Sequence, residues 1–191
     1  MPSTRFPAPA AVLTLLLILI HAAAASAQAP REEFSATLSN ISNVGGIGLT
    51  PLTIRINRWT SDADHERMMG LLRDKGQESF LRALTGQEAV GSIATPVSLK
   101  YDFFYAREQP LAEGGRKIFM ITDRPMDIYE RLNSTRSRDY PFTVIEITLD
   151  KEGNGQGTLA QLVQLRLVGE FLGIENLATS PMKLADIKKV K

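Results

Sequence analysis

The chain contains no cysteine among its 191 residues. It therefore has no disulfide framework, no thiol nucleophile, no thioether attachment for haem and no cysteine for a lipid anchor. Histidine is almost as scarce, since only His21 and His65 are present. If His21 belongs to a cleaved leader, the remaining histidine cannot build the usual zinc or copper sites within one subunit. A Ser-His-Asp triad would have to use His65.

An excess of charge of either sign is also missing. Basic and acidic residues number 22 and 21, and they are interspersed except for Lys188, Lys189 and Lys191 near the carboxyl end. Nothing resembles the basic stripe that binding to nucleic acid or to an anionic membrane requires. We therefore expect no nucleic-acid partner, and we interpret the terminal lysines as a solubilising end.

The amino-terminal segment has the layout of a secretory signal peptide. Arg5 gives it a positive start, residues 11–20 form an apolar core, and residues 25–29 contain two overlapping A-x-A sequences. An uncleaved membrane anchor is the weaker alternative, because the apolar core has about half of the roughly 20 residues that span a bilayer. We therefore expect export, with the periplasm as the destination and the extracellular space as the alternative.

The cleavage site is expected after Ala27. Cleavage after Ala29 would place Pro30 directly after the bond, and the proline ring disfavours the extended geometry that a peptidase needs. The signal peptide is then residues 1–27, and residues 28–191 are long enough for a single domain. No stable membrane anchor is expected after this cleavage.

Most of the mature chain predicts β-structure. Residues 52–57 alternate apolar and polar side chains, which is typical of a strand with one buried face. Glycine-containing turns at residues 113–115 and 151–155 separate pairs of such runs and predict hairpins. The expected strands are residues 33–38, 52–57, 90–95, 98–106, 116–122, 142–149, 157–168 and 171–177. For the segment 182–190 we favour a last strand over a helix.

One helical region interrupts the strands. Ser61 and Asp64 have the spacing of an N-terminal capping box, and Gly76 can end the helix. A second short helix is expected over residues 77–84, and residues 127–132 could form a helical turn. The apolar face of the first helix is expected to contain His65, Met68, Met69 and Leu72, which follow the i, i+3, i+4, i+7 pattern.

These elements predict an α+β fold. Short turns between successive strands favour antiparallel pairing. A sheet of about eight or nine strands tends to curl or to split into two layers. We therefore expect a predominantly antiparallel, curved β-sheet or partial barrel, with a helical insertion after the second strand.

The motifs that suggest metal binding or catalysis are weak. Residues 150–155 are spaced like the start of an EF-hand loop, but Gln161 occupies the position of the bidentate glutamate, and a hairpin turn explains the same residues. Ser180 and Lys183 match S-x-x-K without the partner motifs of penicillin-binding enzymes. Glu146, in the middle of a strand, is the least ordinary carboxylate, yet no partner can be named for it. We therefore name no metal ligand, no cofactor and no catalytic residue.

Two clusters are the candidates for contact with a ligand or partner. Arg55, Arg58 and Trp59 lie at the strand-to-helix junction, whereas Asp123 and Arg124 follow a strand with a buried pattern. Residues in loops and at strand ends carry function more often than residues at strand centres. The structural alternative is that Trp59 closes the end of the core and Asp123 pairs with an arginine.

Four short motifs carry a resemblance. They are Arg58-Trp59-Thr60-Ser61-Asp62, Glu113-Gly114-Gly115-Arg116, Thr122-Asp123-Arg124-Pro125 and Tyr140-Pro141-Phe142-Thr143. Together they resemble a group of exported bacterial proteins to which no activity is assigned. The resemblance covers most of the mature chain and implies a location in the cell envelope and one domain. It implies no catalytic residue.

The sequence favours a non-enzymatic binding or interaction domain over an enzyme. A curved sheet could hold a small apolar ligand against Tyr101, Phe103, Phe104 and Phe119, unless these aromatics simply fill the core. An envelope protein is the other expected partner. The alternative function is a carboxylate-dependent hydrolase that acts on envelope or extracellular polymers. A cavity with facing carboxylates would favour the hydrolase.

Overall fold

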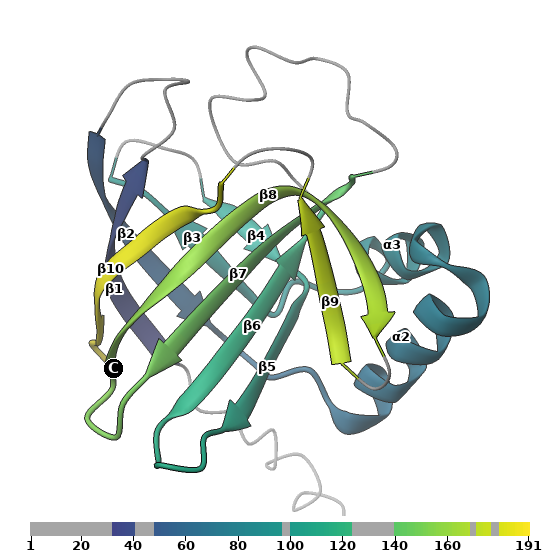
Figure 1. Ribbon diagram of the computed structural model, residues 1–191, viewed down its shortest axis with the longest axis horizontal. Coiled ribbons are helices and arrows are strands. Elements are labelled where there is room, and N and C mark those ends of the chain that lie inside the picture. Colours follow the sequence, from purple (N-terminus) through teal and green to yellow (C-terminus); the bar gives the residue numbers. More distant parts are fainter. Residues whose placement is uncertain (1–31, 41–47, 97–99, 124–139, 169–170, 177–179) are drawn as a thin grey trace, which may run out of the picture.

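The computed structural model describes residues 32–40, 48–96, 100–123, 140–168, 171–176 and 180–191. These residues form one antiparallel sheet and two helices, and in chain order the helices lie between β2 and β3 (Figure 1). The strands are β1 (Glu32–Asn40), β2 (Gly48–Ile56), β3 (Gly91–Ala94), β4 (Tyr101–Phe103), β5 (Tyr105–Pro110), β6 (Arg116–Thr122), β7 (Phe142–Leu149), β8 (Asn154–Val168), β9 (Phe171–Asn176) and β10 (Met182–Lys189). The helices are α2 (Asp62–Lys75) and α3 (Gln77–Thr85).

The sheet curls into a nearly closed barrel. Its hydrogen-bonded order is β4-β3-β2-β1-β10-β8-β7-β6-β5, and every neighbouring pair is antiparallel. The two ends of this order, β4 and β5, are separated in the chain only by Phe104. The sheet therefore closes through one bent segment, in which β4 bonds to β3 and β5 bonds to β6.

The barrel interior is filled with apolar side chains. This first cluster consists of seventeen residues, all of them on strands except Val90. Each is at most 5% exposed. Neighbours on β6 show the alternation that a strand imposes, since Met120 belongs to the interior and Ile121 to a second cluster outside the barrel wall. The interior of the described barrel is therefore a packed core.

The second cluster lies between the outer face of β5–β8 and the two helices. Phe80 on α3 packs edge-on against Phe142 on β7, with ring centroids 5.6 Å apart. The other helical members include Met68, Met69 and Leu72 on α2, which confirms these three residues of the predicted face. His65, the fourth, is only partly buried. Burial on both faces explains why β7 reads as a nearly continuous apolar run, whereas a strand with one solvated face alternates.

The helix ends follow the local sequence signals. The Ser61 side chain accepts a hydrogen bond from the Asp64 backbone N–H at 3.1 Å, which confirms the predicted cap. Gly76 ends α2 with φ +78°, a left-handed conformation that favours glycine, and α3 begins directly afterwards. Residues 127–132 lie outside the described residues.

The two ends of the barrel differ in the length of their connections. Residues 111–115 and 150–153 form the tight β5–β6 and β7–β8 turns at the end where the helical segment also begins (Figure 1). The second of these turns is the hairpin predicted at residues 151–155, and the Asp150 carboxylate accepts a hydrogen bond from the Asn154 N–H at 2.8 Å. At the opposite end, β1 ends at Asn40 and β6 at Thr122, and the strands that follow them in the chain begin only at Gly48 and Phe142.

Most strands differ from their predicted bounds by one to four residues, and β2, for example, begins at Gly48 where residue 52 was expected. Two differences have a clear structural reason. The run 98–106 is divided at Phe104, because the barrel closes there and the two halves bond to different neighbours. β8 begins at Asn154 and bends near Leu162, whose φ is +52°, so its last residues leave β7 and pair with β9. The final segment is a strand, as favoured from the sequence. None of the described helices is long and apolar enough to cross a membrane.

Candidate functional site

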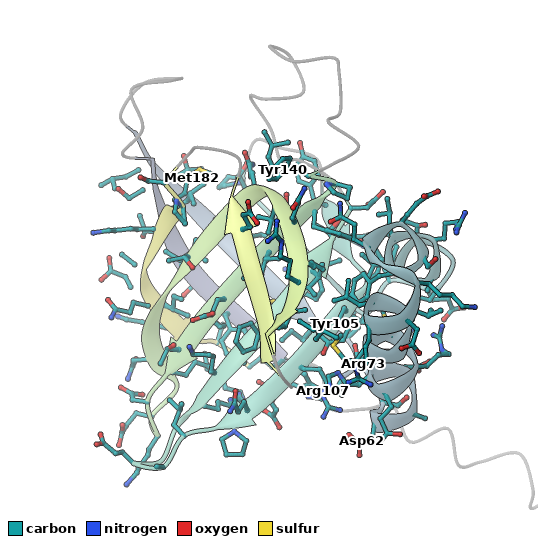
Figure 2. The ribbon with its side chains drawn as sticks, turned by 45° about the vertical axis from the view of Figure 1, so that its right-hand side comes forward. Asp62, Arg73, Tyr105, Arg107, Tyr140 and Met182 are labelled. Carbon is teal, nitrogen blue, oxygen red and sulfur yellow. The ribbon has the colours of Figure 1, made fainter. Side chains whose placement is uncertain are left out.

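A surface pocket of about 380 Å³ lies where the chain passes from β2 to α2. Its lining consists of Trp59, Thr60, Ser61, Asp62, Arg107 and Glu108. We call it the Trp59 pocket. Figure 2 shows Asp62 and Arg107 near the start of α2, on the side of the barrel that the helices cover. The lining residues come from two segments that are about 45 residues apart in the sequence, so only the fold brings them together.

The segment before α2 is fixed to β5 by backbone and side-chain hydrogen bonds. The Thr60 N–H donates to the Ala106 carbonyl at 2.9 Å, and the Ala106 N–H donates to the Thr60 hydroxyl at 3.0 Å. Thr60 is buried, so these bonds satisfy groups that have little access to water. These two hydrogen bonds fix the segment before α2, which forms one wall of the pocket, to β5, which forms the other.

An ion pair crosses the pocket. Arg107 Nη1 lies 2.6 Å from Asp62 Oδ1 and also donates to the Thr60 carbonyl at 3.4 Å. The hydrogen bond from Arg107 lowers the pKa of the Asp62 carboxyl below its usual value, so this carboxylate stays ionised at neutral pH. Asp62 is 87% exposed, whereas Arg107 is 30% exposed, so the pair presents a solvent-accessible carboxylate above a partly covered guanidinium.

A second contact holds α2 beside the pocket. The Tyr105 hydroxyl lies 2.8 Å from His65 Nδ1, and burial raises the pKa of Tyr105 to about 12. The phenol therefore keeps its proton at neutral pH and shares one hydrogen bond with Nδ1 of the imidazole, whose tautomer sets the direction of that bond. Burial lowers the pKa of His65, and the nearby Arg107 lowers it further. These properties describe a neutral contact that anchors a helix to β5.

Arg116, the first residue of β6, lies next to Trp59 at the end of the barrel. Its guanidinium binds both oxygens of Glu32 at 2.5 and 3.2 Å, and it donates to Glu108 at 2.6 Å. The guanidinium also lies 6.0 Å from the ring centroids of both Phe34 and Trp59. Burial alone would lower the pKa of Arg116, but the bonds to Glu32 and Glu108 outweigh burial and raise it.

This network joins strands that are not neighbours in the sheet. Glu32 begins β1 and Arg116 begins β6, so their contact spans the barrel end, and Lys189 on β10 adds a third strand at 3.5 Å from Glu32. Trp59 packs against the same interior cluster. These contacts support the interpretation that Trp59 closes the end of the core. The same residue also lines the pocket.

The structure separates the residues that the sequence singled out. Trp59 lies in the pocket, and Arg58 donates to the Glu88 carbonyl at 2.8 Å. Arg55 forms a pair with Glu33 across β1 and β2, on the outer face of the barrel. Asp123 follows the far end of β6, roughly 23 Å from Arg116 at about 3.3 Å per residue.

Arg124 lies outside the described residues. The aromatic residues that could have held an apolar ligand do not share one surface. Phe103 belongs to the interior cluster, whereas Phe104 packs against the second cluster. The Lys117 ammonium lies 5.6 Å from the centre of the Phe119 ring. Tyr101 packs against the interior cluster. Glu146 forms an ion pair with Lys117 at 2.8 Å, which accounts for this carboxylate without catalysis.

The sequence did not single out Arg107, Glu108 or Glu32, and it named Asp62 and Arg116 only within the motifs of the resemblance. Arg107 and Glu108 follow the two buried residues at the start of β5, and no local alternation marks them as site residues. Nothing in the sequence pairs them with residues 59–62. Among the described residues, no group of three or more His, Asp or Glu side chains could hold a metal ion.

Comparison with known proteins adds no relative. No protein-family model, no curated protein and no solved structure matches the chain. The function must therefore be argued from the chemistry of the pocket.

Proposed function

We propose that this protein is an exported binding domain that holds its ligand in the Trp59 pocket and performs no reaction on it. The observation that carries the proposal is the meeting of an aromatic ring and opposite charges, from separate segments, around one hollow on the surface. Small-molecule sites combine apolar surface with a few convergent polar groups in this way, and 380 Å³ lies within their range of roughly 300–1,000 Å³.

The filled interior supports a surface site over a carrier site. The interior side chains are almost completely buried and occupy the space where an apolar ligand would lie. Packed cores leave few voids larger than a water molecule. An apolar ligand inside the barrel would have to displace several of these side chains, whereas the Trp59 pocket is open without any rearrangement.

Export rests on the amino-terminal segment described above, with its basic start, apolar core and A-x-A sequences. Expression of the full chain in a Gram-negative host tests this part directly. We expect the mature protein in the periplasmic fraction, with Gln28 as its first residue. A full-length protein retained in the cytoplasm or in the membrane would contradict it.

Native mass spectrometry of the periplasmic protein tests binding. We expect a mass excess that denaturation removes and that the Asp62→Ala and Arg107→Ala variants lose. The matched control is Arg166→Ala, because Arg166 forms an exposed pair with Glu175, away from the pocket lining. A mass excess that persists in both pocket variants would place the ligand elsewhere and refute the Trp59 pocket.

A hydrolase is the second candidate, because two carboxylates, Asp62 and Glu108, line the same pocket. Hydrolysis of a glycosidic bond needs one carboxyl that is protonated at the working pH. Asp62 cannot be that acid, because Arg107 lowers its pKa. If the protein is a hydrolase, the Glu108→Gln variant retains the bound ligand intact while the wild type releases cleaved products. If it is a binding domain, both proteins retain the ligand intact.

A further inference from the structure

The hydrogen-bonding groups of the Trp59 pocket are only partly used. Arg107 binds Asp62 and the Thr60 carbonyl through Nη1 alone, and within the described part of the chain its Nε and Nη2 bind no acceptor. Asp62 uses only Oδ1 and Glu108 uses only Oε2 in bonds between described side chains. The pocket therefore offers N–H donors beside carboxylate acceptors, both of which a ligand could bind.

The charges of the pocket are already balanced by protein partners. Asp62 is paired with Arg107, and Glu108 is paired with Arg116, which also binds Glu32. These pairs leave no excess charge of either sign in the pocket to attract an anion or a cation. The arrangement therefore favours a ligand without net charge.

The available hydrogen-bond donors and acceptors favour a ligand that carries hydroxyl groups. A hydroxyl donates one hydrogen bond and accepts others, so two adjacent hydroxyls can donate to a carboxylate and accept from a guanidinium at the same time. Trp59 adds an aromatic surface beside these groups, against which the C–H face of a ring can pack. A sugar ring presents both features, with hydroxyls at its edge and C–H groups on its faces.

From these observations we infer that the ligand of the Trp59 pocket is a neutral saccharide. This inference rests on the proposed binding function and specifies its ligand class. The pocket volume of about 380 Å³ suits a short saccharide or the end of a glycan chain. Because Asp62 is 87% exposed, hydrogen bonds to the ligand compete with water. We therefore expect a single sugar unit to bind weakly, and a longer saccharide to bind tightly enough to stay on the protein through purification.

The protein carries its own probe for the test, because Trp59 is the single tryptophan of the chain. Titrations of the mature protein should follow indole fluorescence with three sets of compounds. The first contains neutral oligosaccharides of glucose, galactose and N-acetylglucosamine. The second contains galacturonate oligomers and inorganic phosphate, and the third contains laurate as an apolar ligand.

We expect a saturable fluorescence change with at least one neutral saccharide, at least tenfold tighter than with the galacturonate oligomer. Asp62→Asn should weaken that binding at least tenfold. Because the Asp62 side chain is exposed, this change should leave the fold intact, which circular dichroism can check. The Arg166→Gln control should bind like the wild type.

The outcomes separate the two proposals. Tighter binding of galacturonate, phosphate or laurate, sensitive to Asp62→Asn, overturns the saccharide inference and leaves the binding function in place. If no compound changes the fluorescence and native mass spectrometry shows the bare protein, both proposals are wrong. Saccharide binding that Asp62→Asn does not weaken overturns the assignment to this pocket.

Discussion

The buried pair between Glu32 and Arg116 gives the sharpest test of the fold. We predict that Arg116→Met destabilises the protein by about 3 kcal/mol. Removing one partner of a buried pair costs about 3–5 kcal/mol, because the remaining charge is left uncompensated. The Glu32 side chain is 11% exposed, so it has little access to water. Lys189, at 3.5 Å, compensates part of its charge, which places the expected cost at the lower end.

Urea unfolding of the mature protein measures this cost, with the slope against urea expected to stay unchanged. The corresponding fall in the thermal midpoint is roughly 6–12 °C for a domain of this size. Arg166→Met is the control, since Arg166 and Glu175 form an exposed pair and its loss should change stability by less than about 0.5 kcal/mol.

A second substitution separates charge from packing. Glu32→Gln added to Arg116→Met removes the uncompensated carboxylate, so we expect the double variant to recover about 2 kcal/mol of the loss. If Arg116→Met costs less than about 1 kcal/mol, the pair does not hold the barrel end together. If Glu32→Gln lowers stability further in the Arg116→Met background, the cost comes from lost packing, and the electrostatic argument fails.

Three further changes test other parts of the structure. Gly70→Ala should stabilise the protein by about 0.5–1 kcal/mol in urea unfolding, since a Cβ there meets nothing within 4 Å and alanine favours a helix interior; destabilisation would show that the position is crowded. Gly155→Ala should cost at least about 2 kcal/mol, because its Cβ would lie 1.9 Å from a backbone oxygen of the adjacent strand, and a neutral result would contradict the β7–β8 register. Stability should fall as pH drops below about 6.5, because burial and Arg107 lower the pKa of His65 in the folded state and protonation therefore favours the unfolded chain. Thermal midpoints measured across pH 5–8 should therefore depend more steeply on pH for the wild type than for His65→Gln. Parallel curves would refute this role of His65.

The elements with strong local signals could be predicted from the sequence. Ser61 caps α2, Gly76 ends it, and the glycines of the β5–β6 and β7–β8 turns adopt the positive φ that such turns require. Each of these depends on a few neighbouring residues, whose preferences act before any tertiary contact forms. The last strand, β10, was ambiguous from the sequence because its apolar spacing fits a helix as well.

The candidate site was predicted only at Trp59. Its partners Arg107 and Glu108 lie on β5, and their distance from Asp62 depends on how α2 packs against the outer face of the barrel. The conformational preferences of neighbouring residues do not determine this distance. The separation of Asp123 from Trp59 has the same cause, because these residues lie at opposite ends of the barrel.

The sequence by itself determined the helix caps, the alternation of the strands and the limits that the lack of cysteine and the scarcity of histidine set on metal sites and catalysis. The export signal at its start is a prediction from the same sequence. All of these are local properties, or properties of residue counts. Only the tertiary structure decided that β4 and β5 close the barrel through Phe104, that Arg116 reaches across its end to Glu32, and that charges from two segments meet at Trp59. The physical reason is that sheet closure and ion pairing depend on distances between residues far apart in the chain. Those distances are fixed by the packing of the whole core and not by any local stretch.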